Sequence, residues 1–381
     1  MLHNQAIDIL KTLVAFETVS RDSNLKLIDW FEEYCVSYGA RTKRIYNQDK
    51  NKANLIISFG PDVDGGIVLS GHSDVVPIDD QEWNTNPFEL TQIGDKLYGR
   101  GTADMKAFSA CFLALVPRIA RENLKRPIYF ALSYDEEIGC LGAPSMVDDL
   151  ANNYPKIDAV IVGEPTNMKV VSAHKSISTF KIEITGHEAH SSRPDQGVSA
   201  IMEAIDLLSF IKELSNSIKN PNSIFEPDGA TLSVGIIEGG TAVNILAHYC
   251  RFLFDIRCEP DFDNSILIDK IAQKVTQIDA QIKKRAPNGG AKMIRRSNTP
   301  GLKYEANSNS ENICRQITGD NDVFGVAYAA EAGLFQRAGF NAVICGPGSI
   351  LQAHQPNEFI EIIEIEKCIN FLEKLLENHF L

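Results

Sequence analysis

Short apolar runs alternate with helical segments along the first part of the chain. Apolar residues recur at helical spacing over 7–14, and a mostly apolar helix is predicted over 105–120. Four bounded runs rich in aliphatic residues are predicted to be buried strands: 54–59, 66–70, 127–133 and 158–162. Because strands and helices alternate, the pattern predicts an α/β fold with a mostly parallel sheet.

The pattern changes after about residue 175, where apolar and polar residues alternate one by one. Alternation is typical of strands that have one face in water, and such strands form antiparallel sheets. Segments of this kind lie at 180–185, 251–257 and, less clearly, 232–234. Two helical stretches, 198–218 and 264–280, lie among them. We therefore predict an α+β domain with an antiparallel sheet over 176–295.

The last part of the chain returns to the α/β pattern. A break rich in proline and glycine begins at Pro287 and separates this part from the α+β region. A strand is predicted at 341–345 and a long helix at 360–379. The simplest arrangement is a small domain inserted into a larger one, with residues 1–175 and 296–381 in the larger domain and 176–295 in the inserted one.

The composition is that of a folded protein. Of 381 residues, 44% are hydrophobic and 23% are charged, which excludes a disordered tail, a collagen and a coiled coil. The 37 Lys+Arg against 50 Asp+Glu leave a net charge of −13. A nucleic-acid partner is not expected, because phosphate binding needs a clustered basic surface. The length exceeds what one hydrophobic core usually supports, in agreement with two domains.

Neither a membrane partner nor export is expected from the sequence. No segment reaches about 18 uninterrupted apolar residues, the length that spans a bilayer. Asp8 and Lys11 interrupt the apolar residues near the N-terminus, which does not resemble a secretion signal. The eight cysteines are scattered, with no CxxC pair. These features predict a cytoplasmic protein whose cysteines are core residues.

Polar side chains that bind metals or transfer protons follow three of the predicted strands. They are His72 and Asp74 after 66–70, Asp135, Glu136 and Glu137 after 127–133, and Glu164 after 158–162. In open α/β sheets, ligands bind in the crevice beyond the carboxyl ends of the strands. We therefore expect these carboxylates and this imidazole to meet at one edge of the sheet.

Two further residues extend this group. Asp104 lies in a glycine-bounded loop at 99–106, and His354 lies in a loop that follows the predicted strand 341–345. So many carboxylates do not stay ionised together unless cations compensate their charge. Imidazole with carboxylate ligands favours Zn, Co or Mn, and a pair of such ions polarises a carbonyl group and activates water. Asp104 is well placed to bridge the pair.

Five segments resemble, in this order along the chain, the signatures of the M20 metallopeptidase family. They are GHSDVVP (71–77), LYGRGTADMK (97–106), DEEIG (135–139), GEPT (163–166) and GHEAHSSRP (186–194). The resemblance implies a zinc-exopeptidase-like catalytic domain, and an inserted lid domain that also joins two subunits in a homodimer. It implies two divalent metal ions as cofactors, with zinc first and cobalt as the alternative.

The resemblance also implies roles for the candidate residues. The implied metal ligands are His72 and Glu164 for one ion, Glu137 and His354 for the other, and Asp104 between them. Glu136 is implied to be the general base, and Asp74 to be the carboxylate that orients the imidazole of His72. His190 is implied to reach the active site of the partner subunit and to stabilise the tetrahedral oxyanion.

Three residues are expected to bind substrate. Asn244 and Arg257 resemble family residues that hold it, and the guanidinium of Arg257 is suited to pair with an α-carboxylate. Glu331 is our own hypothesis for the residue that selects the δ-ammonium group of ornithine. It occupies a loop where relatives that act on acidic substrates carry small neutral residues.

The implied reaction is hydrolysis of the amide of an N2-acyl amino acid, with N2-acetyl-L-ornithine as the first candidate and arginine synthesis as the setting. N2-acetyl-L-citrulline, N-succinyl-diaminopimelate and other N-acyl amino acids remain alternative substrates. A binding protein on an inactive M20 scaffold is the alternative outside enzymes, and the complete ligand set together with Glu136 disfavours it. No GxSxG elbow and no phosphate-binding glycine loop is present, so neither serine-hydrolase nor nucleotide chemistry is indicated.

Overall fold

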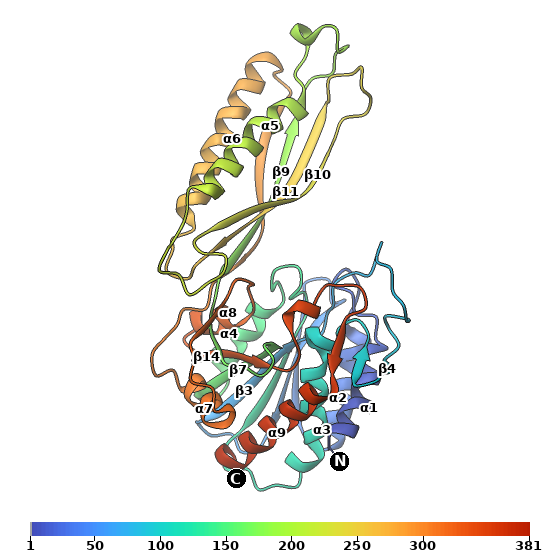
Figure 1. The fold of residues 1–381 in the computed structure, drawn as a ribbon, viewed down its shortest axis with the longest axis vertical. Helices are drawn as coiled ribbons and strands as arrows, with labels where there is room; N and C mark the ends of the chain where they lie inside the picture. The colour runs from blue at the N-terminus through green and yellow to red at the C-terminus, as the bar shows by residue number, and fades with distance from the viewer. Residues whose placement is uncertain (1) are drawn as a thin grey trace. The chain divides into compact units, whose positions relative to one another are not determined.

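The computed structural model describes residues 2–381, which form two compact units. The larger unit contains the residues before 174 together with 302–325 and 330–381, and the smaller unit contains 174–301 and 326–329. In Figure 1 the chain of the smaller unit runs from green through yellow to orange. Within residues 2–381, every helix is too short or too polar to cross a membrane.

A mixed eight-stranded sheet runs through the larger unit, with its strands in the order β1, β2, β6, β3, β7, β14, β8 and β13. The central strands β6, β3, β7 and β14 run parallel, whereas β1 and β2 at one edge, and β8, pair antiparallel with their neighbours. The strands are β1 (Arg41–Tyr46), β2 (Ala53–Phe59), β3 (Gly66–His72), β6 (Ile128–Ser133), β7 (Ile157–Pro165), β8 (Val171–His174), β13 (Phe324–Val326) and β14 (Ala342–Gly346). The predicted α/β fold, with a sheet that is mostly parallel in its core, is confirmed.

Helices cover both faces of this sheet. Figure 1 shows α1, α3 and α9 on one side of it and α4 and α8 on the other. The helices of the larger unit are α1 (Leu2–Val14), α2 (Leu25–Ser37), α3 (Ala107–Ile119), α4 (Ala143–Asn153), α7 (Asn309–Thr318), α8 (Ala332–Arg337) and α9 (Ile362–His379). Because both faces are covered, β2, β3 and β6 are buried along their whole lengths, which explains their uninterrupted apolar sequences.

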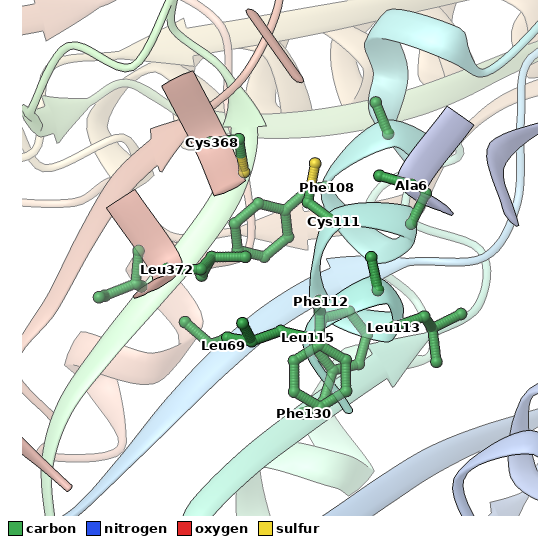
Figure 2. Close-up of a cluster of buried hydrophobic side chains, with 14 of the residues drawn as sticks. Ala6, Leu69, Phe108, Cys111, Phe112, Leu113, Leu115, Phe130, Cys368 and Leu372 are labelled. Atoms are coloured by element: carbon green, nitrogen blue, oxygen red, sulfur yellow. The ribbon is translucent and has the colours of Figure 1, made fainter. Parts of the chain in front are cut away.

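Helix α3 lies at the centre of the main hydrophobic core, as Figure 2 shows. Its residues are buried on every side except near Pro117 and Arg118. The ring of Phe112 stacks on that of Phe130 in β6, with 4.4 Å between the ring centroids. Complete burial of a phenylalanine side chain stabilises a fold by about 1.5–3 kcal/mol. This packing supports the amino end of α3, which directly follows the loop that carries Asp104.

A separate three-stranded sheet joins two distant loops of the larger unit. It consists of β4 (Thr91–Ile93), β5 (Lys96–Tyr98) and β15 (Phe359–Glu361), in the order β15, β5, β4. Phe359 pairs with Tyr98 in antiparallel register. The loop after β5 carries Asp104, and the segment before β15 carries His354, so this sheet brings two predicted site residues towards each other.

The smaller unit has a four-stranded antiparallel sheet in the order β10, β11, β9, β12. Its elements are β9 (Ser176–Thr185), α5 (Ala200–Asn216), β10 (Thr231–Gly239), β11 (Tyr249–Cys258), α6 (Ser265–Arg285) and β12 (Gly290–Thr299). Successive residues of β9 and β11 alternate between buried and partly exposed, and their buried residues pack with those of α5 and α6 in one cluster. The predicted antiparallel sheet is confirmed.

Strand β12 was not predicted, because the proline and glycine residues from Pro287 onward indicated only a break. They do form a turn, with the backbone N–H of Gly289 donating to the carbonyl of Ala286. The chain then pairs with β9 from Gly290 to Thr299. As a result, the smaller unit continues to residue 301, beyond the predicted limit at 295.

Candidate metal centre and active site

The parallel strands of the larger unit bring three groups of site residues to one edge. His72 is the last residue of β3 and lies level with Ser133, the last residue of β6. The segment DEE at 135–137 follows two residues later. On the other side of β3, Ser70 pairs with Val162, so Glu164 of β7 lies level with His72. The residues that were expected to meet beyond the carboxyl ends of these strands therefore lie at one edge of the sheet.

Two sets of side chains at this edge of the sheet are close enough to hold metal ions. The candidate ligand atoms of His72, Glu136 and Glu164 all lie within 4.8 Å of one another, and so do those of His72, Asp104 and Glu137. His72 Nε2 lies 3.0 Å from Asp104 Oδ1 and 3.8 Å from Glu164 Oε1. Proximity alone does not separate the general base from the ligands here, because Glu136 belongs to the first set.

His354 approaches the same cluster from its other end. Its Nε2 lies 2.9 Å from Glu137 Oε2 and 3.4 Å from Asp104 Oδ2. Asp104 thus has one oxygen directed to His72 and the other to His354, as a carboxylate between two metal ions requires. His354 has a left-handed backbone (φ +63°), and more than half of its side chain is exposed.

The imidazole of His72 is oriented by the backbone of Asp74. His72 Nδ1 donates to the backbone carbonyl of Asp74 at 2.9 Å, whereas its distance to Asp74 Oδ1 is 3.7 Å, too long for a hydrogen bond. In this structure the ring is therefore held by the backbone of Asp74, and a role of the Asp74 carboxylate in orienting it stays a prediction. The donated Nδ1–H leaves Nε2 as the ligand nitrogen of a neutral imidazole.

The carboxylate of Asp74 instead holds the segment that carries the two glutamates. It accepts the backbone N–H groups of Glu136 at 3.1 Å and Glu137 at 3.3 Å, and the hydroxyl of Ser20 at 2.7 Å. The neighbouring Asp135 has a left-handed backbone (φ +56°) and forms an ion pair of 2.5 Å with the buried Lys52. These contacts fix the directions in which Glu136 and Glu137 point.

Burial and the neighbouring charges both shift the pKa values of the cluster. Burial raises the pKa of Glu136 and Glu164 well above the ordinary range and that of Glu137 to about 7. Burial would lower the pKa of His72, but its hydrogen bond to Asp104 and the nearby carboxylates raise it. For Asp104 the two histidines outweigh burial, so its pKa is lowered. Divalent cations would remove the cost of keeping these carboxylates ionised.

The residues present fit a pair of divalent metal ions. Glu137 Oε1 is buried and has no hydrogen-bond partner among residues 2–381, which leaves this oxygen available as a ligand. The other donors are two imidazole nitrogens and further carboxylate oxygens, the ligands that zinc and similar ions bind.

Residues 68–378 match the peptidase family M20/M25/M40. The chain belongs to this family. It is 32% identical over 387 residues to the acetylornithine deacetylase of Buchnera aphidicola subsp. Acyrthosiphon pisum (strain Tuc7), covering 97% of each chain. It is 30% identical over 381 residues to the acetylornithine deacetylase of Pasteurella multocida (strain Pm70), again covering 97% of each. The predicted M20 membership is confirmed, and the protein is an enzyme of the hydrolase class.

Solved structures of M20 proteins have the same fold. The M20 metallo-carboxypeptidase of Sulfolobus solfataricus superposes with a TM-score of 0.80 at 17% identity, over 98% of this chain and 99% of that chain. A dinuclear metal-binding M20 peptidase of Bacillus subtilis superposes with a TM-score of 0.64 at 14% identity, over 98% and 97%. At these identities the likeness concerns the fold alone.

Glu331 lies inside the M20 catalytic unit, with 1% of its surface exposed. Its carboxylate accepts the hydroxyl of Ser70 at 3.2 Å and also that of Ser133. Burial raises the pKa of Glu331 to about 7. Each of its oxygens accepts one serine hydroxyl, and the role of Glu331 in selecting a substrate ammonium group stays a prediction. Glu331 lies directly before α8, and the sequence around it did not indicate that this residue would be buried.

The remaining predicted residues lie in the smaller unit. His190 and Asn244 are exposed neighbours, because His190 forms a β-bridge with Ile245 and the Ser191 N–H donates to the Asn244 carbonyl at 2.9 Å. His190 Nδ1 lies 2.8 Å from the hydroxyl of Ser192. Arg257 is in β11, and its Nε lies 3.6 Å from Asp255 Oδ1. The roles of these three residues remain predictions.

Proposed function

We propose that this M20 enzyme hydrolyses N2-acetyl-L-ornithine to L-ornithine and acetate, a step in arginine synthesis. The observation that carries the proposal is the cluster of His72, Asp104, Glu137, Glu164 and His354 around one crevice, with Glu136 beside it. The similarity to acetylornithine deacetylases over 97% of the chain supports the substrate.

The proposed ligands are His72 and Glu164 for one ion, Glu137 and His354 for the other, and Asp104 between them. When bound, two zinc or cobalt ions would polarise the acetyl carbonyl and lower the pKa of water. Glu136 takes a proton from the attacking water and returns it to the leaving amine. Burial raises the pKa of the Glu136 carboxyl well above its usual range, which favours its acceptance of a proton before it returns that proton to the amine.

We further propose a homodimer in which His190 stabilises the oxyanion in the active site of the partner subunit, and Asn244 and Arg257 hold the substrate. Support comes from the smaller unit, where β10 is an edge strand whose Ile236 and Ile237 are about half exposed. Unpaired edge strands with apolar side chains tend to pair with another chain. All eight cysteines are buried, as core residues of a protein in a reducing compartment are, which supports the proposed cytoplasmic location.

The substrate is tested by measuring acetate release from N2-acetyl-L-ornithine, N2-acetyl-L-citrulline and N-acetyl-L-methionine after chelation and after zinc or cobalt is restored. Metal-dependent turnover that favours acetylornithine by about tenfold in kcat/KM, or 1.4 kcal/mol, supports the proposal. A preference for the neutral substrates would keep the metal chemistry and overturn the named substrate. No turnover on all three would direct the search to succinylated amines.

The dimer proposal is tested by mixing two inactive variants, Glu136→Gln and His190→Ala. If His190 acts across subunits, a mixed dimer contains one site that has both Glu136 and a His190 from the partner, and activity returns. If His190 acts within its own subunit, both sites of the mixed dimer stay inactive. A wild-type enzyme that is a monomer by light scattering and is nevertheless active would also contradict the proposal.

A further inference from the structure

The buried carboxylate of Glu358 is surrounded by four donors from the loop that carries Asp104. Its Oε2 accepts from Arg100 Nη1 at 2.7 Å and from the Gly101 N–H at 3.0 Å. Its Oε1 accepts the backbone N–H groups of Ala103 at 2.8 Å and Asp104 at 3.1 Å. Only 1% of the Glu358 surface is exposed. Three of the four bonds thus hold backbone rather than a side chain.

The same glutamate is tied to the segment that carries His354, four residues earlier in the chain. The Gly99 N–H donates to the Glu358 carbonyl at 3.0 Å, and Phe359 then pairs with Tyr98 across β15 and β5. The Asp104 loop and the His354 segment are therefore joined at Glu358 through both its backbone and its side chain.

Arg100 and Gln81 extend these links to the backbone around His354. Arg100 Nη2 donates to Gln81 Oε1 at 2.6 Å, and Gln81 Nε2 donates to the backbone carbonyl of His354 at 3.1 Å. Arg100 Nη1 also lies 3.3 Å from the carbonyl of Gln355. We call Glu358, Arg100 and Gln81 the Glu358 clamp.

We propose that Glu358 is a positioning residue that fixes Asp104 relative to His354, so that these two ligands are held in place before metal binds. The inference rests on the proposed metal ligands and goes beyond them. Successive backbone N–H groups that converge on one anion form a stable cradle, and hydrogen bonds to an ionised acceptor are stronger than those to a neutral one.

The loop needs such an anchor because of its own sequence. Gly101 has a left-handed backbone (φ +82°), and a Cβ at this position would lie 2.8 Å from Val75 Cγ1. Glycine is therefore required here, although it also gives the unanchored loop more conformational freedom. Four hydrogen bonds to one carboxylate restrict that freedom at the residues next to the proposed bridging ligand.

The substitution Glu358→Gln tests the clamp with almost no change in shape. A glutamine amide has one acceptor oxygen, so its NH2 group faces either Arg100 and Gly101 or Ala103 and Asp104. Two donors lose their acceptor in either orientation. We expect the metal-free variant to fold and to bind zinc at least about tenfold more weakly than wild type in chelator competition. We also expect kcat at saturating zinc to fall more than KM changes.

Glu311→Gln is the matched control. Glu311 is also a buried glutamate, and its Oε1 accepts two bonds from Arg315, at 3.1 and 2.7 Å. It lies in α7, and its hydrogen bonds and ion pair in 2–381 are all to Arg315 rather than to a proposed ligand. Both variants should lower the thermal stability of the metal-free protein. Only Glu358→Gln should lower zinc affinity.

Several outcomes would overturn the inference. Wild-type zinc affinity in folded Glu358→Gln would do so, and so would equal losses of affinity in Glu358→Gln and Glu311→Gln. If Glu358→Gln does not fold, Gln81→Met takes its place, because Gln81 is only partly buried. This change removes the bond to the His354 carbonyl and the acceptor of Arg100 Nη2 and Trp83 Nε1, and leaves the four bonds to the Glu358 carboxylate in place. Unchanged zinc affinity in Gln81→Met would then overturn the clamp.

The result is separable from the proposed function. A wild-type protein that binds no zinc or cobalt would refute the metal centre and the clamp together. A wild-type protein that binds zinc but does not hydrolyse acetylornithine would refute the substrate alone, and the comparison of zinc affinities would still decide the role of Glu358.

Discussion

Replacing Asp74 with asparagine tests how the structure holds the two glutamates of the active site. The buried Asp74 carboxylate accepts the Glu136 N–H through Oδ1 and the Glu137 N–H through Oδ2. Asparagine keeps one acceptor oxygen, and its NH2 group faces the other backbone N–H. One of the two N–H groups therefore loses its acceptor in either orientation, at a cost of about 1–3 kcal/mol.

If the lost hydrogen bond lets Glu136 move away from its catalytic position, the same free energy is added to the barrier of the chemical step. At 1.36 kcal/mol for each factor of ten, the expected kcat at saturating zinc and substrate is roughly 5- to 150-fold lower. The bond from His72 Nδ1 to the Asp74 carbonyl is unaffected, because it involves backbone. We therefore expect zinc affinity, measured by chelator competition, to stay near that of wild type.

Ser20→Ala is the control for this experiment, because it removes only the hydroxyl that donates to Asp74 at 2.7 Å and leaves both backbone bonds in place. Its kcat should stay close to that of wild type. An imidazole oriented by the Asp74 carboxylate would instead lose about 10- to 100-fold in metal affinity on Asp74→Asn. That loss, with an unchanged kcat at saturating zinc, would refute the reasoning.

Three further predictions follow from the site and the core. Glu136→Gln should lower kcat by about 10²- to 10⁴-fold while zinc binding in chelator competition is retained, and loss of zinc would instead make Glu136 a ligand. Zinc binding near neutral pH should release protons, because hydrogen bonds to Asp104 and Glu137 raise the pKa of His354 to about 10 and burial raises that of Glu137 to about 7. Zinc affinity should therefore rise above neutral pH, and calorimetric heats that do not depend on the buffer would contradict this. Phe112→Ala should lower the free energy of unfolding by about 3–5 kcal/mol in urea titrations, and a loss below about 1 kcal/mol would contradict the stacking on Phe130.

Hydrophobic periodicity was sufficient to predict most of the fold. The central strands appear in the sequence as apolar runs because both of their faces are covered, and β9 and β11 alternate because one face is wet. Strand β12 was missed because it lies at the edge of its sheet, with mostly partly exposed residues and little apolar alternation. Edge strands lack the burial on which the pattern depends.

The proximity of His72, the segment 135–137 and Glu164 was predictable because these residues lie at or just after the ends of neighbouring parallel strands. Their individual contacts were not, as Asp74 and Glu331 show. The spacing of Asp74 from His72 does not tell whether the ring is held by a carboxylate or by a backbone carbonyl. For Glu331, partners lie at Ser70 and Ser133, far away in the sequence. Glu358 lies four residues after His354, but nothing local in the sequence indicated its four donors.

These three residues have one physical property that separates them from Glu137, one of the proposed ligands. Asp74, Glu331 and Glu358 have both carboxylate oxygens engaged by N–H or O–H donors, whereas Glu137 has a buried oxygen without such a donor in 2–381. A carboxylate whose oxygens are engaged holds protein in place, and one with a free oxygen can bind a cation. Because all four are buried acidic residues near one crevice, composition and strand position do not distinguish them. The number of N–H or O–H donors around each carboxylate distinguishes them. Replacing each carboxylate with its amide should therefore separate residues that position other groups from residues that bind metal.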